Sequence, residues 1–205
     1  MAEIQRASRK ELFGWAMFDF ANSSYTTVII TVVFCIIFPR LIVGDGPEFR
    51  LGNLLWSTAL SMSYLIVLLS APVLGAVMDF TGSKQKFLFA SCLLTVSATA
   101  AFYFVGPGEV ILGILLIILS NVGFSYSESF VSSFLPGLGP PRDLGKISGY
   151  AWGLGYFGGL TSTAIVIFGL GAGVYTLENF SRLKMVGPAT ALFFLIAAIP
   201  TFLWV

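Results

Sequence analysis

Six long apolar stretches constrain what this chain can fold into more than any other feature of its sequence. A helix needs roughly 20 apolar residues to cross about 30 Å of hydrocarbon. A lone strand would leave its backbone N–H and C=O groups unpaired in lipid, so each stretch is predicted to be a transmembrane helix. The predicted spans are Leu12–Phe38, Leu54–Met78, Phe87–Val105, Val110–Leu135, Ile147–Gly169 and Val186–Val205. The expected fold class is therefore all-α, a polytopic membrane protein in which residues 1–205 form one six-helix bundle.

The composition agrees with a lipid environment and excludes several kinds of function. Of 205 residues, 57% are hydrophobic and 10% are charged, which is well outside the range of soluble domains. A net charge of +1 gives no indication of nucleic-acid binding. Histidine is absent, which removes the commonest general base and metal ligand, and Cys35 and Cys92 stand alone in apolar runs as small hydrophobic residues. We expect no metal site, no cofactor and no nucleic-acid partner.

The basic residues predict which side of the membrane each connection occupies. No lysine or arginine lies within any of the six predicted helices. One side would carry Arg6, Arg9, Lys10, Lys84, Lys86, Arg142 and Lys146, and the other Arg40, Arg50, Arg182 and Lys184. Cytoplasmic loops are enriched in lysine and arginine, so this seven-to-four division places both termini in the cytoplasm. The connection between the third and fourth spans is only four residues long, which predicts a tight antiparallel hairpin.

Two of the predicted helices carry a polar stripe. In the first helix the polar residues recur at offsets of three, four and seven, and in the fourth at four, seven and eleven, so each set shares one helical face. The two sets are Asp19, Asn22, Ser23 and Thr26, and Asn121, Ser125, Glu128 and Ser132. Such stripes are disfavoured against lipid and must face protein or water. We therefore expect them to line a pathway for a solute or a proton.

Two acids lie at matching depths inside the predicted bundle. Asp19 is seven residues from the start of the first stretch, and Glu128 is seven residues from the end of the fourth, so each lies roughly 10 Å inside the membrane. Without a cationic neighbour in the helices, either carboxyl group could be neutral at rest and titrate when water reaches it. Each could hold a coupling proton or a substrate ammonium group, and the alternative is a hydrogen-bonded structural role near a helix end.

The fifth predicted helix begins with a run of glycine and aromatic residues. Small residues recur four apart at Gly149 and Gly153 and again at Gly155 and Gly159, a spacing that permits close approach of a neighbouring helix. Trp152 and Tyr156, also four apart, could line a cavity as an aromatic wall. Packing alone would also explain the glycines.

The connection between the second and third spans carries a recognisable pattern. The residues concerned are Gly75, Asp79, Gly82, Lys84 and Lys86. They resemble the loop signature of the major facilitator superfamily, G-x-x-x-D-x-x-G followed by basic residues. The superfamily loop has arginine directly after the acid, where this chain has Phe80, so a charge relay would depend on Lys84 and Lys86. In the superfamily this loop acts as a cytoplasmic latch between two halves.

Further segments resemble one branch of that superfamily, the vacuolar effluxers and their bacterial relatives. They are GWAMFDFANSSYTTVI (Gly14–Ile29), NVGF (Asn121–Phe124), FLP (Phe134–Pro136) and SGYAWGLGYFGG (Ser148–Gly159). The resemblance implies a secondary transporter in a plasma membrane, working by alternating access, and the fungal members are associated with amino-acid export. The family has twelve spans, so this chain is expected to be an N-terminal half that requires a C-terminal half.

Three other interpretations remain open. A natural six-helix half could assemble as a homodimer, and the reading frame beyond Val205 would distinguish the two cases. A membrane scaffold that moves nothing would have no need for two polar stripes. An intramembrane enzyme is disfavoured because the chain lacks histidine, although Asp19 and Glu128 could formally act as an acid pair.

Overall fold

Six helices in the computed structural model are long and apolar enough to cross a membrane. The structure describes residues 7–44, 46 and 48–205, so Arg6, counted above on the basic side, lies outside the described residues. The candidate spans are Arg9–Val43, Arg50–Thr81, Lys84–Phe104, Val110–Gly137, Pro141–Gly169 and Phe180–Trp204. The all-α fold and the number of spans predicted from the sequence are confirmed.

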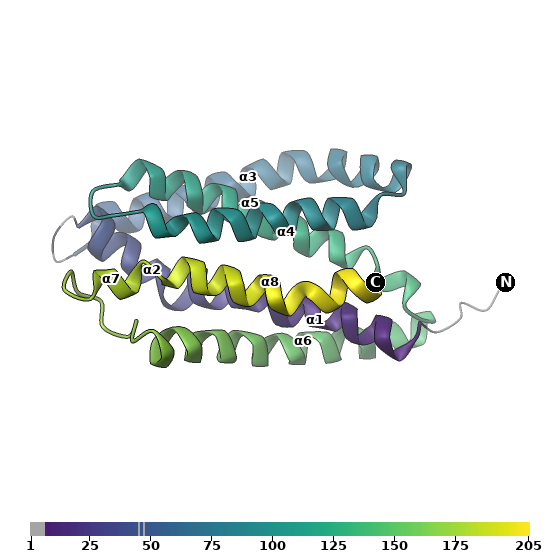
Figure 1. Ribbon diagram of the computed structural model, residues 1–205. Coiled ribbons are helices and arrows are strands. Elements are labelled where there is room, and N and C mark those ends of the chain that lie inside the picture. The colour runs from purple at the N-terminus through teal and green to yellow at the C-terminus, as the bar shows by residue number, and fades with distance from the viewer. Residues whose placement is uncertain (1–6, 45, 47) are drawn as a thin grey trace.

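The six spans form two layers of three helices (Figure 1). One layer contains α3 (Arg50–Thr81), α4 (Lys84–Ala101) and α5 (Val110–Ser132), and the other α1 (Arg9–Ser24), α6 (Pro141–Ala164) and α8 (Val186–Trp204). Within the layers, α5 packs against both α3 and α4, and α1 packs against both α6 and α8. The main contact between the layers joins α4 to α8. The first span thus packs with the fifth and sixth, and the fourth packs with the second and third.

Shorter elements complete the chain. The first span continues beyond α1 as a π-helix η1 (Tyr25–Val32), α2 (Phe34–Ile37) and a second π-helix η2 (Phe38–Val43). The others are the 3₁₀-helices η3 (Phe102–Phe104) and η4 (Leu135–Gly137), the π-helix η5 (Ile165–Gly169), and α7 (Phe180–Leu183). The sequence pattern contained no indication of the three π-helical segments.

The helices extend beyond the apolar stretches, so the prediction that they contain no lysine or arginine is wrong. Backbone hydrogen bonding continues into the polar flanks, where charged side chains reach water. At the start of α1, Ser8 and Glu11 form a capping box in which Glu11 N–H donates to Ser8 Oγ over 3.2 Å and Ser8 N–H donates to the Glu11 carboxylate over 2.6 Å. Helices α3 and α4 likewise begin at Arg50 and Lys84. The basic residues within the helices therefore lie near the helix ends.

The two ends of the bundle differ in basic charge. The first described residues, Val205 and the α3–α4 connection lie at one end, and the α4–α5 connection and α7 lie at the other (Figure 1). Within the described residues, the first end holds Arg9, Lys10, Lys84, Lys86, Arg142 and Lys146, and the second Arg40, Arg50, Arg182 and Lys184. The residues counted together in the sequence thus share an end of the bundle. The cytoplasmic location of the first end stays a prediction.

Helices α4 and α5 form the predicted hairpin. They are joined through η3 and a turn in which Gly108 has a φ of +87°, a left-handed conformation that favours glycine. The Gly108 N–H donates to the Ile42 carbonyl over 2.8 Å, which ties this turn to the end of the first span. The tight antiparallel pairing of these helices is confirmed.

Helix α6 lies unusually close to α1 because its facing positions are glycines. A Cβ atom placed on Gly158 would lie 2.0 Å from the Phe20 carbonyl oxygen, and one on Gly159 would lie 2.5 Å from Thr27 Oγ1. Such contacts exclude any larger residue, as in small-residue interfaces of membrane helices generally. A Cβ atom placed on Gly149 or Gly153 would meet no other atom within 4 Å, so these two glycines do not serve this contact. Close packing therefore accounts for Gly155 and Gly159 and does not account for Gly149 and Gly153.

Substitution of Gly158 by alanine should separate α6 from α1. Overpacking of this kind costs about 1–3 kcal/mol, so we expect a lower melting temperature and a smaller monodisperse fraction in size-exclusion chromatography of the detergent-solubilised protein. Gly153→Ala is the matched control, since nothing lies near its Cβ position and alanine favours helix. Equal stability of the two variants would contradict the close approach.

Candidate functional site

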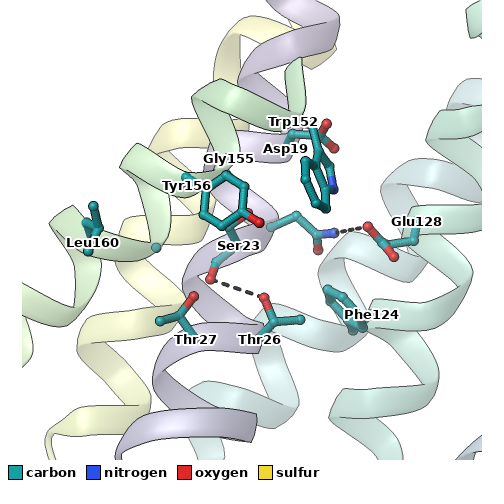
Figure 2. Close-up of a pocket in the computed structure, with 12 residues that line it drawn as sticks. Asp19, Ser23, Thr26, Thr27, Phe124, Glu128, Trp152, Gly155, Tyr156 and Leu160 are labelled. Carbon is teal, nitrogen blue, oxygen red and sulfur yellow. Dashed lines mark hydrogen bonds between the residues drawn. The ribbon is translucent and has the colours of Figure 1, made fainter. Parts of the chain in front are cut away.

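A cavity of about 380 Å³ lies where α1, η1, α5 and α6 meet (Figure 2). Its lining residues come from these elements alone. They are Asp19, Asn22 and Ser23 from α1, Thr26 and Thr27 from η1, Phe124 and Glu128 from α5, and Trp152, Gly155, Tyr156, Gly159 and Leu160 from α6. Polar groups are supplied chiefly by the first span, and aromatic surface chiefly by α6. The cavity thus has chemically different walls.

The first span changes its helical geometry beside this cavity. From Tyr25 the backbone adopts π-helical bonding, and the Val33 N–H donates to the Val28 carbonyl over 3.0 Å, five residues back. Thr31 Oγ1 donates to the Thr26 carbonyl over 2.8 Å, also five residues back. Single π-helical turns are rare and occur frequently at functional sites. Here the change of geometry begins at the depth where the polar stripe lines the cavity.

Asn22 connects the first span to the acid on α5. Its Nδ2 donates to Glu128 Oε1 over 3.3 Å, drawn as a dashed line in Figure 2. The Asn22 side chain is 2% exposed, and its Oδ1 atom has no hydrogen-bond partner among the described residues. A buried polar atom of this kind carries a desolvation cost unless a proton donor reaches it. Asn22 Oδ1 therefore remains available as an acceptor beside the Glu128 carboxyl group.

Further contacts hold the first span and α5 together on either side of this bond. Trp15 Nε1 donates to the Val131 carbonyl over 2.9 Å. The Tyr25 hydroxyl lies 2.8 Å from Ser120 Oγ, and the Tyr25 ring stacks on Phe124 with centroids 5.1 Å apart. These anchors fix the spacing of the two polar helices at levels above and below Glu128.

The aromatic wall is formed by Trp152 and Tyr156. Their rings meet edge to face with centroids 5.0 Å apart, and their side chains are 67% and 61% exposed. Glycines at positions 155 and 159 bring this part of α6 against Ser23 and Thr27. Both large rings therefore border an open side of the cavity and do not fill the bundle core.

The lining is acidic and holds no basic side chain. Asp19 is half-buried, Glu128 is exposed at the open side, and none of the twelve lining residues is lysine or arginine. Within the described part of the chain the ion pair between Arg50 and Glu48, at 2.5 Å, lies outside this cavity. Carboxyl groups in this setting favour a proton or a cationic group as a counter-ion. An anionic group would meet no compensating positive charge in this lining.

The two polar stripes and the aromatic pair gave ten predicted pathway residues, and seven of them line this cavity. They are Asp19, Asn22, Ser23, Thr26, Glu128, Trp152 and Tyr156. Asn121 is fully buried and donates from Nδ2 to Ser63 Oγ on α3 over 2.6 Å, so at this level α3 covers the polar face of α5. Ser125 is half-buried and does not line the cavity. The expected continuous stripe of α5 thus divides between two neighbours.

The sequence interpretation omitted several lining residues that a simple spacing would have found. Thr27 lies four residues after Ser23, and Phe124 lies four residues before Glu128, so each shares a helical face with a polar residue already identified. Leu160 follows Tyr156 by the same spacing. Extending each predicted face by one helical turn would have found all three residues.

The loop pattern between α3 and α4 has a different set of contacts from the one expected. Gly82, with a φ of +62°, terminates α3, and its N–H donates to the Asp79 carbonyl. Lys84 donates from Nζ to the Ser133 carbonyl at the end of α5 over 2.9 Å, so it does not pair with Asp79. Within the described residues Asp79 has no ion-pair partner, and Lys86 is exposed. Lys84 therefore contacts the end of α5 in this structure, and its part in a charge relay stays a prediction.

Comparison with known proteins finds sequence similarity to transporters. A family model described as "Vacuole effluxer Atg22 like" matches residues 55–143. An uncharacterized MFS-type transporter of Bacillus subtilis, YxiO, is 28% identical over 149 residues, covering 73% of this chain and 35% of the relative. The chain thus spans about a third of the length of the relative it matches, and no solved structure matches significantly. Together with the six helices long and apolar enough to cross a membrane, these two matches support the Atg22-like branch of the major facilitator superfamily as the family that this chain resembles.

Proposed function

We propose that this chain is the N-terminal half of a proton-coupled secondary transporter that moves a small solute across a bacterial plasma membrane by alternating access. The observation that carries the proposal is the cavity between α1, α5 and α6, with two carboxyl groups and no basic side chain in its lining. Both acids come from within membrane spans, where ionisable residues are costly and typically belong to ion or substrate pathways. The excess of basic residues at the end of the bundle that holds the first described residues and Val205 supports a cytoplasmic location for that end.

The substrate that fits this lining carries a cationic group. An ammonium group can donate hydrogen bonds to a carboxylate and to Asn22 Oδ1, which lacks a partner among the described residues. The exposed faces of Trp152 and Tyr156 add a surface that favours cations or apolar groups. Amino acids, the class implied by the resemblance to vacuolar effluxers, combine an ammonium group with a variable side chain and are the proposed substrates.

A second six-helix half is proposed to close the cavity. Glu128, Trp152 and Tyr156 are exposed on its open side, and the chain spans 35% of its transporter relative. In transporters built from two such halves the binding site lies between them, near the middle of the membrane. This second half would be either a C-terminal continuation or, in the homodimer alternative, another copy of this chain.

Glu128→Gln in the full-length transporter should abolish the pH dependence of transport. The glutamine keeps the size and the contact with Asn22 but cannot release a proton, so we expect solute accumulation driven by a pH gradient to fall about tenfold or more, within the usual range of coupling energies. Uptake of a panel of radiolabelled amino acids into proteoliposomes, followed against pH, measures this. Asp19→Asn is tested in parallel.

Glu178→Gln is the matched control for this experiment. Glu178 is an exposed acid in the connection between α6 and α7, outside the cavity. Its variant should keep the wild-type pH profile. Unchanged pH dependence in both Glu128→Gln and Asp19→Asn would exclude proton coupling through these acids.

Asp79→Asn in the full-length transporter should impair cycling more than membrane insertion. Asp79 is exposed and has no ion-pair partner among the described residues, as expected for a residue that pairs with another half in one state of the cycle. The turnover per inserted molecule should fall while expression stays near the wild-type level. Loss of expression with normal specific activity would show that the loop is structural only.

A further inference from the structure

A second concave surface lies on the outside of the bundle, between α4 and α8. It has a volume of about 230 Å³ and is lined by Phe89, Cys92, Leu93, Leu195, Ile199, Phe202 and Leu203. The thiol of Cys92 is the only side-chain heteroatom in this lining. We name this surface the α4–α8 groove. It shares no residue with the cavity proposed for transport.

The length of the groove matches that of a lipid hydrocarbon chain. Its residues on α8 run from Leu195 to Leu203, a length of about 12 Å at 1.5 Å per residue, close to the ~15 Å of one leaflet's hydrocarbon. A single extended acyl chain lying along the helices fits.

A basic residue stands at one end of the groove. Lys86 precedes Phe89 by three residues and Leu93 by seven, which places the three side chains on one face of α4. Lys86 is exposed, and within the described residues it forms no ion pair. It lies in the first turn of α4, where the helix dipole is positive and no acidic side chain offsets it. The groove therefore ends in local positive charge.

We propose that the α4–α8 groove binds an anionic phospholipid, with one acyl chain along the groove and the headgroup phosphate on Lys86. The apolar lining supplies the contact area, and a lysine can extend its ammonium group from the end of a span to the headgroup level. Phe89 and Phe202, which meet edge to face with centroids 5.5 Å apart, provide a rigid floor near the headgroup end. The proposal does not depend on the transported solute.

Lipid binding to the full-length protein can be measured by native mass spectrometry after delipidation in detergent. The purified protein is titrated with phosphatidylglycerol or with phosphatidylcholine of the same acyl chains. One phosphatidylglycerol should bind about fivefold more tightly than phosphatidylcholine, because a lysine near the headgroups contributes about 1 kcal/mol. Lys86→Gln should remove this preference and leave phosphatidylcholine binding unchanged.

Two matched controls separate the groove from general lipid contact. Lys146→Gln removes a basic residue at the same end of the bundle, on α6, and should keep the preference. Leu195→Trp should fill the groove and weaken binding of both lipids, whereas Leu192→Trp, on an exposed α8 position outside the groove, should not. Equal binding of the two lipids by the wild type, a preference retained by Lys86→Gln, or equal binding by the two tryptophan variants would overturn the proposal. Absence of any tightly bound lipid would also overturn it.

Discussion

The close contact between α6 and α1 is the interaction on which the candidate site depends. Gly158 leaves no room for a Cβ atom beside the Phe20 carbonyl, so the two helices approach as nearly as their backbones allow. Contacts of this kind replace the hydrophobic driving force that lipid does not provide between helices. The same approach sets Gly155 and Gly159 against Ser23 and Thr27. It thereby brings the aromatic wall of α6 to the polar face of the first span.

The polar groups of the cavity are held in position by helix contacts on either side of them. Trp15 and Tyr25 bond the first span to α5 on either side of the Asn22–Glu128 hydrogen bond. Buried polar groups that are only partly satisfied are costly, and Asn22 Oδ1 is one of them among the described residues. Cost of this kind is typical of sites that bind something else during their cycle. The π-helical turn that starts at Tyr25 adds a second departure from regular structure at the same level.

Much of the fold and part of the site could be predicted because both follow from periodicity. Asp19 and Glu128 were identified from their depth and spacing, and the structure places them in one cavity. Asn121 shares the periodicity of Glu128 yet bonds to Ser63 on α3. Lys84 belongs to the loop pattern around Asp79, yet its side chain donates to the Ser133 carbonyl at the end of α5. Periodicity defines a helical face but not the neighbour that covers it.

The sequence by itself determined the six membrane helices, their alternating direction and the end of the bundle at which each described basic residue lies. These properties follow from local apolar length and from the cost of placing unpaired polar groups in lipid. Only the tertiary structure decided that α1 packs with α6 and α8, that α5 packs with α3 and α4, and that a cavity opens between α1, α5 and α6. In lipid every apolar face is equally well solvated, so the choice of neighbours depends on shape and on a few polar contacts, which no single helix encodes.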